Sequence, residues 1–117
     1  MFTTEQIKAA SQKEAAAMIR ANMAENEKWL VRGLLAIYSR QTADEQVSAA
    51  TRHDNGVGFS AFDADILSSY AQQVQRWEAQ PASQRQYAAP LSPRQKEVAV
   101  RKMSRYARQL ATIVQEA

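Results

Sequence analysis

The residue types best suited to chemistry gather in one ten-residue stretch, 51–60, which reads T-R-H-D-N-G-V-G-F-S. It contains the only histidine of the chain, His53, beside Asp54, together with two of the three glycines. An imidazole and a carboxylate could transfer protons, and glycines could bring backbone N–H groups close to a phosphate. However, the sequence lacks an identifiable nucleophile, a complete G-x-G-x-x-G or G-x-x-x-x-G-K-[ST] motif, and a second His or Cys for a metal. We therefore predict no catalytic residue, no metal site and no cofactor, and expect that the protein is not an enzyme.

The same stretch has the composition of a tight corner between two helices. Asn55 and Gly56 form a turn dipeptide because both residues tolerate positive φ, and Gly58 would let another backbone approach closely. Phe59 would then precede the next helix and pack against Ala64 as a hydrophobic staple. We expect a Gly-containing corner here.

A second group of residues with chemical potential is a row of cations near the C-terminal end. Of the 15 Lys and Arg residues, six lie in residues 90–117 with only two acids, while the other residues carry nine bases and ten acids. At 100° per residue, the arginines at 94, 101, 105 and 108 fall within about 60° of one another on a helix. Such a row could follow the phosphates of DNA or RNA, although it could also be an ordinary solvated face. The expected nucleic-acid contacts are Arg94, Arg101, Lys102, Arg105 and Arg108.

A protein partner is the alternative to nucleic acid. The row of cations could dock on an acidic protein surface, as in a small adaptor or inhibitor encoded by a mobile element. Arg52 and His53 at the rim of the corner, and Tyr87 in a proline-containing loop, are the side chains that we expect to contact such a partner. A third hypothesis is a homo-oligomer that self-associates through apolar parts of the first helix.

Helical periodicity indicates four main helices and therefore a small all-α bundle. The first begins at Thr3 and lies within residues 1–25, where a thin apolar face predicts loose packing on the bundle. The second covers about residues 27–40 and is apolar around most of its circumference, so we expect it at the centre, with Gly33 at a close helix crossing. A Thr42-x-x-Glu45 pattern then predicts a short separate helix over residues 43–50, with a short strand as the alternative.

The third helix is predicted to begin at Ser60, with Asp63 as the N3 carboxylate of its first turn. Residues 79–91 contain two prolines and no periodicity, and they predict a mobile loop. The fourth helix has a clear start, with Ser92 at the N-cap, Pro93 at N1 and Gln95 at N3. The apolar stripe expected on the third helix consists of Phe62, Ile66, Tyr70, Val74 and Trp77.

Length and composition fit one domain spanning residues 1–117. The absence of cysteine suits a reducing compartment, so we expect a cytoplasmic protein. The first residues, M-F-T-T-E-Q-I-K, lack the basic and apolar regions of a signal peptide. No apolar run is long enough to predict a membrane span.

Several short patterns follow one another in a fixed order between residues 51 and 111. They are N-G-V-G-F at 55–59, D-A at 63–64, L-S-S at 67–69, L-S-P-R-Q at 91–95 and R-Y-A-R-Q-L at 105–110. Together they resemble a segment of phage- and plasmid-type DNA-metabolism proteins that accompanies helicase or single-strand-handling regions. The resemblance implies an accessory module near nucleic acid without helicase chemistry, because no Walker motif is present. It points to Arg105, and to Arg101 one helical turn earlier, as contacts.

Overall fold

The chain forms an all-α bundle in a computed structural model that describes residues 1–48 and 58–117. Its α-helices in chain order are α1 (Thr4–Ala9), α2 (Gln12–Glu25), α3 (Glu27–Ser48), α4 (Ala61–Ala79), α5 (Pro93–Met103) and α6 (Ala107–Glu116). Two short 3-10 segments, η1 (Ala82–Gln84) and η2 (Ser104–Tyr106), follow α4 and α5. Because α5, η2 and α6 are continuous in sequence, they act as one interrupted helix. The second, third and fourth predicted helices are therefore present, and the first predicted helix is divided into α1 and α2.

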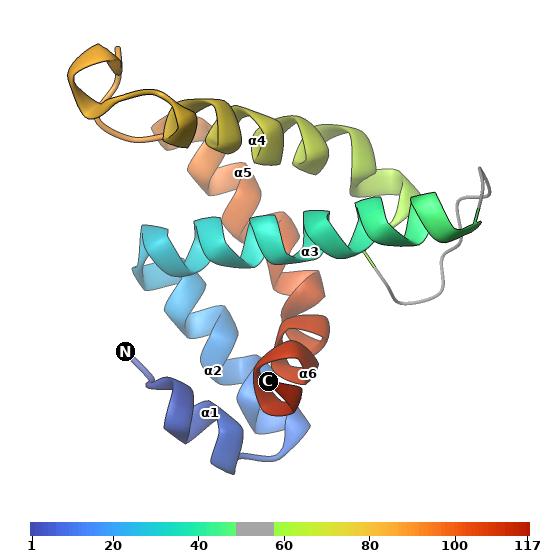
Figure 1. The fold of residues 1–117 in the computed structure, drawn as a ribbon. Coiled ribbons are helices and arrows are strands. Elements are labelled where there is room, and N and C mark those ends of the chain that lie inside the picture. Colours follow the sequence, from blue (N-terminus) through green and yellow to red (C-terminus); the bar gives the residue numbers. More distant parts are fainter. Residues whose placement is uncertain (49–57) are drawn as a thin grey trace.

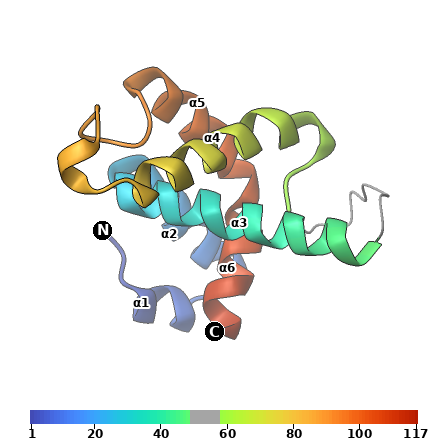
Figure 2. The same cartoon turned by 45° about the horizontal axis from the view of Figure 1, so that its top comes forward.

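Helix α3 lies at the centre, with α4 on one side and α2 and α6 on the other (Figure 1). The same arrangement is visible after rotation (Figure 2). A Cβ at Gly33 would lie 3.0 Å from Leu110 Cδ1 and 3.3 Å from Met23 Sδ. Glycine therefore lets α2 and α6 approach α3 closely, which confirms the predicted close crossing.

The N-terminal segment differs from the prediction in two ways. It contains two helices, because Ser11 has an extended backbone and its hydroxyl accepts a hydrogen bond from the Glu14 N–H at 3.1 Å, so that a new helix begins. The segment is also well packed, since Ile7 and Ile19 have no exposed surface. Alanines on α2 allow close contact with α3 and α6, so a thin apolar face is sufficient for burial.

The separate short helix expected over residues 43–50 is not formed, because α3 continues without interruption to Ser48. A capping box requires an extended residue at the N-cap, and Thr42 lies inside a helix instead. Residues 49 and 50 lie outside the described part of the chain.

The last residues of the predicted corner are described and match the prediction. Gly58 has φ +80°, and a Cβ there would lie 2.6 Å from Gln41 Cβ and 2.8 Å from Gln41 Cα. This close approach to α3 therefore requires glycine. Ser60 occupies the N-cap of α4 as predicted, although its hydroxyl makes no capping hydrogen bond. Asn55 and Gly56 lie outside the described residues.

The proline-containing loop, which we predicted to be mobile, makes several contacts with the end of α4. The guanidinium carbon of Arg85 lies 3.9 Å from the ring centroid of Trp77. Its Nε donates to the carbonyl oxygens of Trp77 at 3.0 Å and Gln80 at 3.1 Å. The Trp77 indole N–H in turn donates to the carbonyl oxygen of Tyr87 at 2.9 Å. Arg85 thus adds a second hydrogen bond to the Trp77 carbonyl oxygen, which also accepts from the Gln80 N–H at the end of α4, and pairs the carbonyl oxygen of the C-cap residue Gln80.

Helix α5 begins as predicted. The Ser92 hydroxyl accepts from the Gln95 N–H at 3.1 Å, and Gln95 Oε1 accepts from the Ser92 N–H at 2.9 Å. Pro93 occupies the first helical position, where its missing N–H costs nothing. This capping box fixes the start of the segment that carries the row of cations.

Candidate functional site

Asp63 on α4 is a carboxylate with no exposed surface. Such a charge needs partners, and it has three. The Tyr106 hydroxyl donates to Oδ2 at 2.6 Å, Lys102 Nζ donates to Oδ1 at 3.2 Å, and Arg105 Nη1 donates to Oδ2 at 3.2 Å. These partners belong to α5 and η2, so Asp63 links α4 to the basic segment. Asp63 does occupy the predicted N3 position of α4. Its side chain is buried, however, and does not form a solvent-exposed capping group.

The partners of Asp63 determine its charge state. Burial by itself raises the pKa of the Asp63 carboxyl, but the hydrogen bonds from Tyr106 and Lys102 and the charge of Arg105 outweigh burial, so the pKa lies below its ordinary value. Burial and the hydrogen bond to Asp63 raise the pKa of Tyr106. The Tyr106 hydroxyl also accepts from the Ser60 N–H at 3.1 Å. At neutral pH the network therefore holds one carboxylate, two cations and a protonated tyrosine.

The predicted cations differ in how accessible they are. Arg94, Arg101 and Arg108 are exposed, as a solvent-facing row requires. Arg105 keeps 57% of its side chain exposed, because only Nη1 contacts Asp63 and its other N–H groups can bind another acceptor. Lys102 has only 16% of its side chain exposed, since its ammonium is directed at Asp63. Lys102 is therefore the least accessible of the predicted contacts.

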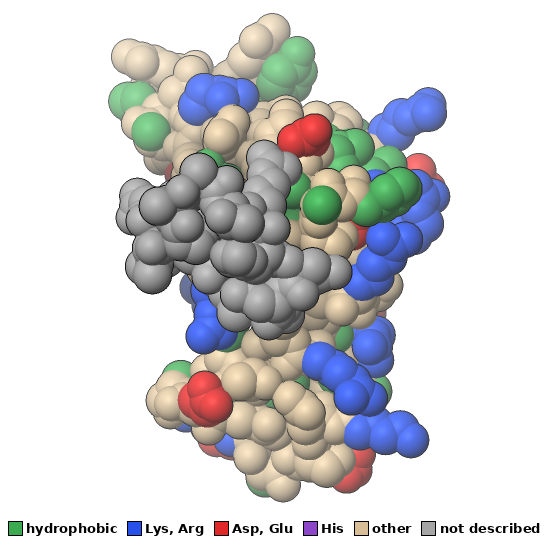
Figure 3. Space-filling model, turned by 90° about the vertical axis from the view of Figure 1, so that its right-hand side faces the viewer, with side chains coloured by type: hydrophobic (Ala, Val, Ile, Leu, Met, Phe, Trp, Pro, Cys, Tyr) green, Lys and Arg blue, Asp and Glu red, His purple; other side chains and the backbone are tan. Residues whose placement is uncertain are grey.

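Helix α2 adds a cation that the sequence pattern did not reveal. Arg20 is exposed, and its Nε donates to the carbonyl oxygen of Ser104 at 3.0 Å, next to Arg105 in the chain. Arg20 and Ser104 are 84 positions apart in the sequence, so no local pattern could predict this contact. We call the resulting surface the basic face; it consists of Arg20, Arg101, Lys102, Arg105 and Arg108. Figure 3 shows a column of Lys and Arg side chains along one edge of the molecule.

The predicted apolar stripe of α4 is partly wrong. Phe62 is 80% exposed and Ile66 is 37% exposed, although Val74 is fully buried as expected. The inward face instead carries Asp63 and Leu67, together with alanines. The hydrogen bonds of Asp63 hold this face toward α5 and η2, and the two large apolar side chains consequently point away from the core.

Phe62 borders the basic face. Its ring centroid lies 5.2 Å from Lys102 Nζ and 6.0 Å from Arg105 Cζ, which is within cation–π range. In Figure 3, hydrophobic side chains lie directly beside the upper part of the column of cations. Hydropathy alone assigns a phenylalanine to the core, and this is why the sequence pattern missed Phe62 as a surface residue.

The candidate partner contacts do not join this surface. Tyr87 is 68% exposed as expected, but its backbone is hydrogen-bonded to Trp77 near the end of α4. Lys102 and Arg105 contact Asp63 in the first turn of α4, roughly 20 Å away along a helix of this length. Arg52 and His53 lie outside the described residues.

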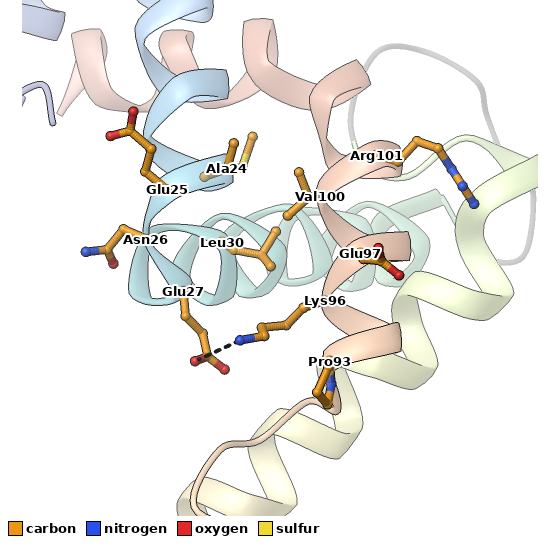
Figure 4. Close-up of a pocket in the computed structure, with 11 residues that line it drawn as sticks. Ala24, Glu25, Asn26, Glu27, Leu30, Pro93, Lys96, Glu97, Val100 and Arg101 are labelled. Carbon is orange, nitrogen blue, oxygen red and sulfur yellow. Dashed lines mark ion pairs between the residues drawn. The ribbon is translucent and has the colours of Figure 1, made fainter.

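A hollow of about 470 Å³ lies between the α2–α3 corner and α5 (Figure 4). Lys96 Nζ is 3.8 Å from Glu27 Oε2 across it, while Glu27 Oε1 is buried without a hydrogen-bond partner in the described part of the chain. The Arg101 side chain extends away from this pair (Figure 4).

Within residues 1–48 and 58–117, no group of three His, Cys, Asp or Glu side chains could hold a metal ion. In the same ranges, no helix combines the length and the apolar character needed to cross a membrane.

The candidate site thus consists of a buried carboxylate, a face of five cations from several elements, and one exposed aromatic ring. No protein-family model, curated protein or solved structure matches this chain.

Proposed function

We propose that this chain is a non-enzymatic accessory protein that binds nucleic acid electrostatically through the basic face. The observation that carries the proposal is that Lys102 of α5 and Arg105 of η2 meet at one carboxylate that is itself buried. Exposed arginines extend the basic face from there: Arg20 of α2 donates to the Ser104 carbonyl oxygen next to Arg105, and Arg101 and Arg108 lie on the same continuous segment. Ordinary solvent faces mix both signs of charge, which lowers their attraction for polyanions. Each phosphate neutralised by a Lys or Arg releases condensed counterions, so a concentrated patch binds DNA or RNA without base-specific contacts.

The Asp63 network supports this role by fixing one of the cations. Arg105 donates to Asp63 through Nη1 and keeps 57% of its side chain exposed, so its other N–H groups can bind a second acceptor. A guanidinium already held in place loses less side-chain entropy when it binds a phosphate. The resemblance of residues 51–111 to segments of DNA-metabolism proteins points in the same direction.

A salt titration of binding to single- and double-stranded DNA tests the proposal. The site variant is Arg101→Glu/Arg108→Glu; Arg105 is left unchanged because a glutamate there would face Asp63. The matched control, Arg32→Glu/Arg76→Glu, reverses two exposed arginines on α3 and α4 and changes the net charge equally. We expect the site variant to bind more weakly than the control and to lower the slope of log K against log salt by about two units.

Two outcomes would contradict nucleic-acid binding. One is an affinity that does not change between low and moderate salt, and the other is an equal loss in the site and control variants. Co-purification of one defined acidic protein, together with no binding to any oligonucleotide, would favour the alternative adaptor or inhibitor function.

A further inference from the structure

Phe62 is an exposed ring that lies against two cations of the basic face. Single exposed apolar side chains are common on protein surfaces, so exposure alone says little about function. Phe62 differs because two cations lie within 6.0 Å of its ring while 80% of the residue stays accessible. The ring and the cations therefore present one combined surface to a ligand.

This surface is preformed. Phe62 directly precedes Asp63, and Asp63 fixes both Lys102 and Arg105 through its carboxylate oxygens. The Ser60 N–H donates to Tyr106 Oη at 3.1 Å, so the start of α4 is tied to η2 as well. The first turn of α4, which carries the Phe62 ring, is therefore hydrogen-bonded to α5 through Asp63 and to η2 through Ser60.

We infer that Phe62 stacks against an unpaired base while Arg105 and Arg101 contact the adjacent phosphates, so that the ligand is single-stranded nucleic acid. This inference rests on the proposed function and adds the class of ligand. Proteins that bind single strands combine a positive groove with aromatic rings, and stacking tolerates any base because every base has a π face. In a duplex the bases are stacked on one another, and a surface ring reaches them only by wedging the base pairs apart.

Three substitutions at position 62 separate stacking from general apolar contact. Phe62→Tyr keeps an aromatic ring, Phe62→Leu keeps apolar bulk without a ring, and Phe62→Ala removes both. Ile66→Ala, one turn further along the same exposed face, is the matched control. Binding is measured by fluorescence anisotropy with a labelled oligothymidylate and with a duplex of the same length, at one fixed low salt concentration.

The wild-type protein should prefer the single strand. We expect Phe62→Ala and Phe62→Leu to weaken that binding about tenfold, whereas Phe62→Tyr and Ile66→Ala should stay within about twofold of wild type. Duplex affinity should be unchanged in all four variants. Thermal melts of the variants should match wild type, because the side chain at position 62 is exposed.

The outcomes separate this inference from the proposed function. Single-strand binding that survives Phe62→Ala, or is retained by Phe62→Leu, overturns base stacking and leaves electrostatic binding intact. An equal loss on the duplex indicates a wedge between base pairs and overturns the single-strand assignment. A wild-type protein that binds neither oligonucleotide refutes the proposed function itself, whatever the variants do.

Discussion

Replacing Asp63 by asparagine tests whether the buried carboxylate holds α4 to the C-terminal helices. Asparagine has nearly the same shape and can still accept the hydrogen bond of Tyr106, but it carries no charge for Lys102 and Arg105. Removing one member of a buried ion pair typically costs about 3–5 kcal/mol. Here the cost is reduced because water reaches the partners, whose side chains are 16% and 57% exposed. We expect Asp63→Asn to lower the free energy of unfolding by about 2–3 kcal/mol, or roughly 8–12 °C in Tm.

The pH dependence gives an independent readout of the same interaction. The pKa of Asp63 is lowered in the folded state, so its carboxylate stabilises the fold fully above the unfolded-state pKa of about 3.9. That contribution is lost as the pH falls through the lowered folded-state pKa. The stability difference between wild type and Asp63→Asn should therefore be constant from about pH 5 to 7 and shrink below about pH 4.

Urea denaturation followed by tryptophan fluorescence measures both quantities. Asp65→Asn is the control, because Asp65 is an exposed carboxylate on the same helix and should change stability by less than about 0.5 kcal/mol. Equal effects of the two substitutions would refute the role assigned to the buried carboxylate. So would a stability difference that persists unchanged into acid.

Three further substitutions test other contacts of the fold by urea denaturation. Gly58→Ala should cost about 2–3 kcal/mol, because φ is +80° and the new Cβ would lie 2.8 Å from the α3 backbone; a neutral effect would contradict the close approach. Asn22→Ala should cost about 1–3 kcal/mol, since this buried amide pairs with both the N–H and the carbonyl oxygen of Phe2 at 2.9 Å. Ser92→Ala should cost about 1 kcal/mol through the lost cap of α5, and no loss would show that the capping box is dispensable.

Features that depend on local hydrogen bonds or backbone space could be predicted from the sequence. The start of α5 at Ser92 and Pro93 is one, because a capping box uses residues three positions apart. The need for glycine at positions 33 and 58 is another such feature, because glycine has no Cβ atom that would meet the neighbouring helix. The exposure of the four arginines at 94, 101, 105 and 108 followed from helical periodicity alone.

Features that depend on distant partners could not be predicted. Hydropathy assigns Phe62 to the core and Asp63 to the surface, and the structure reverses both. The reversal depends on Lys102, Arg105 and Tyr106, which are 39, 42 and 43 positions from Asp63. The position of Arg20 beside η2 likewise depends on a distant partner, the carbonyl oxygen of Ser104. The Ser11-x-x-Glu14 pattern that begins α2 is different, because it is local and was readable in the sequence.

The contacts of α6 with the first two helices affect the order in which the protein can fold during synthesis. Gln115 Nε2 donates to the carbonyl oxygens of Ile7 at 3.1 Å and Ala10 at 2.8 Å, and Gln12 Nε2 donates to Thr112 Oγ1 at 2.9 Å. These contacts join residues 100 or more positions apart. The apolar sides of α1 and α2 therefore lack this cover on a growing chain until α6 has left the ribosome, and the bundle can close only after translation has passed that helix.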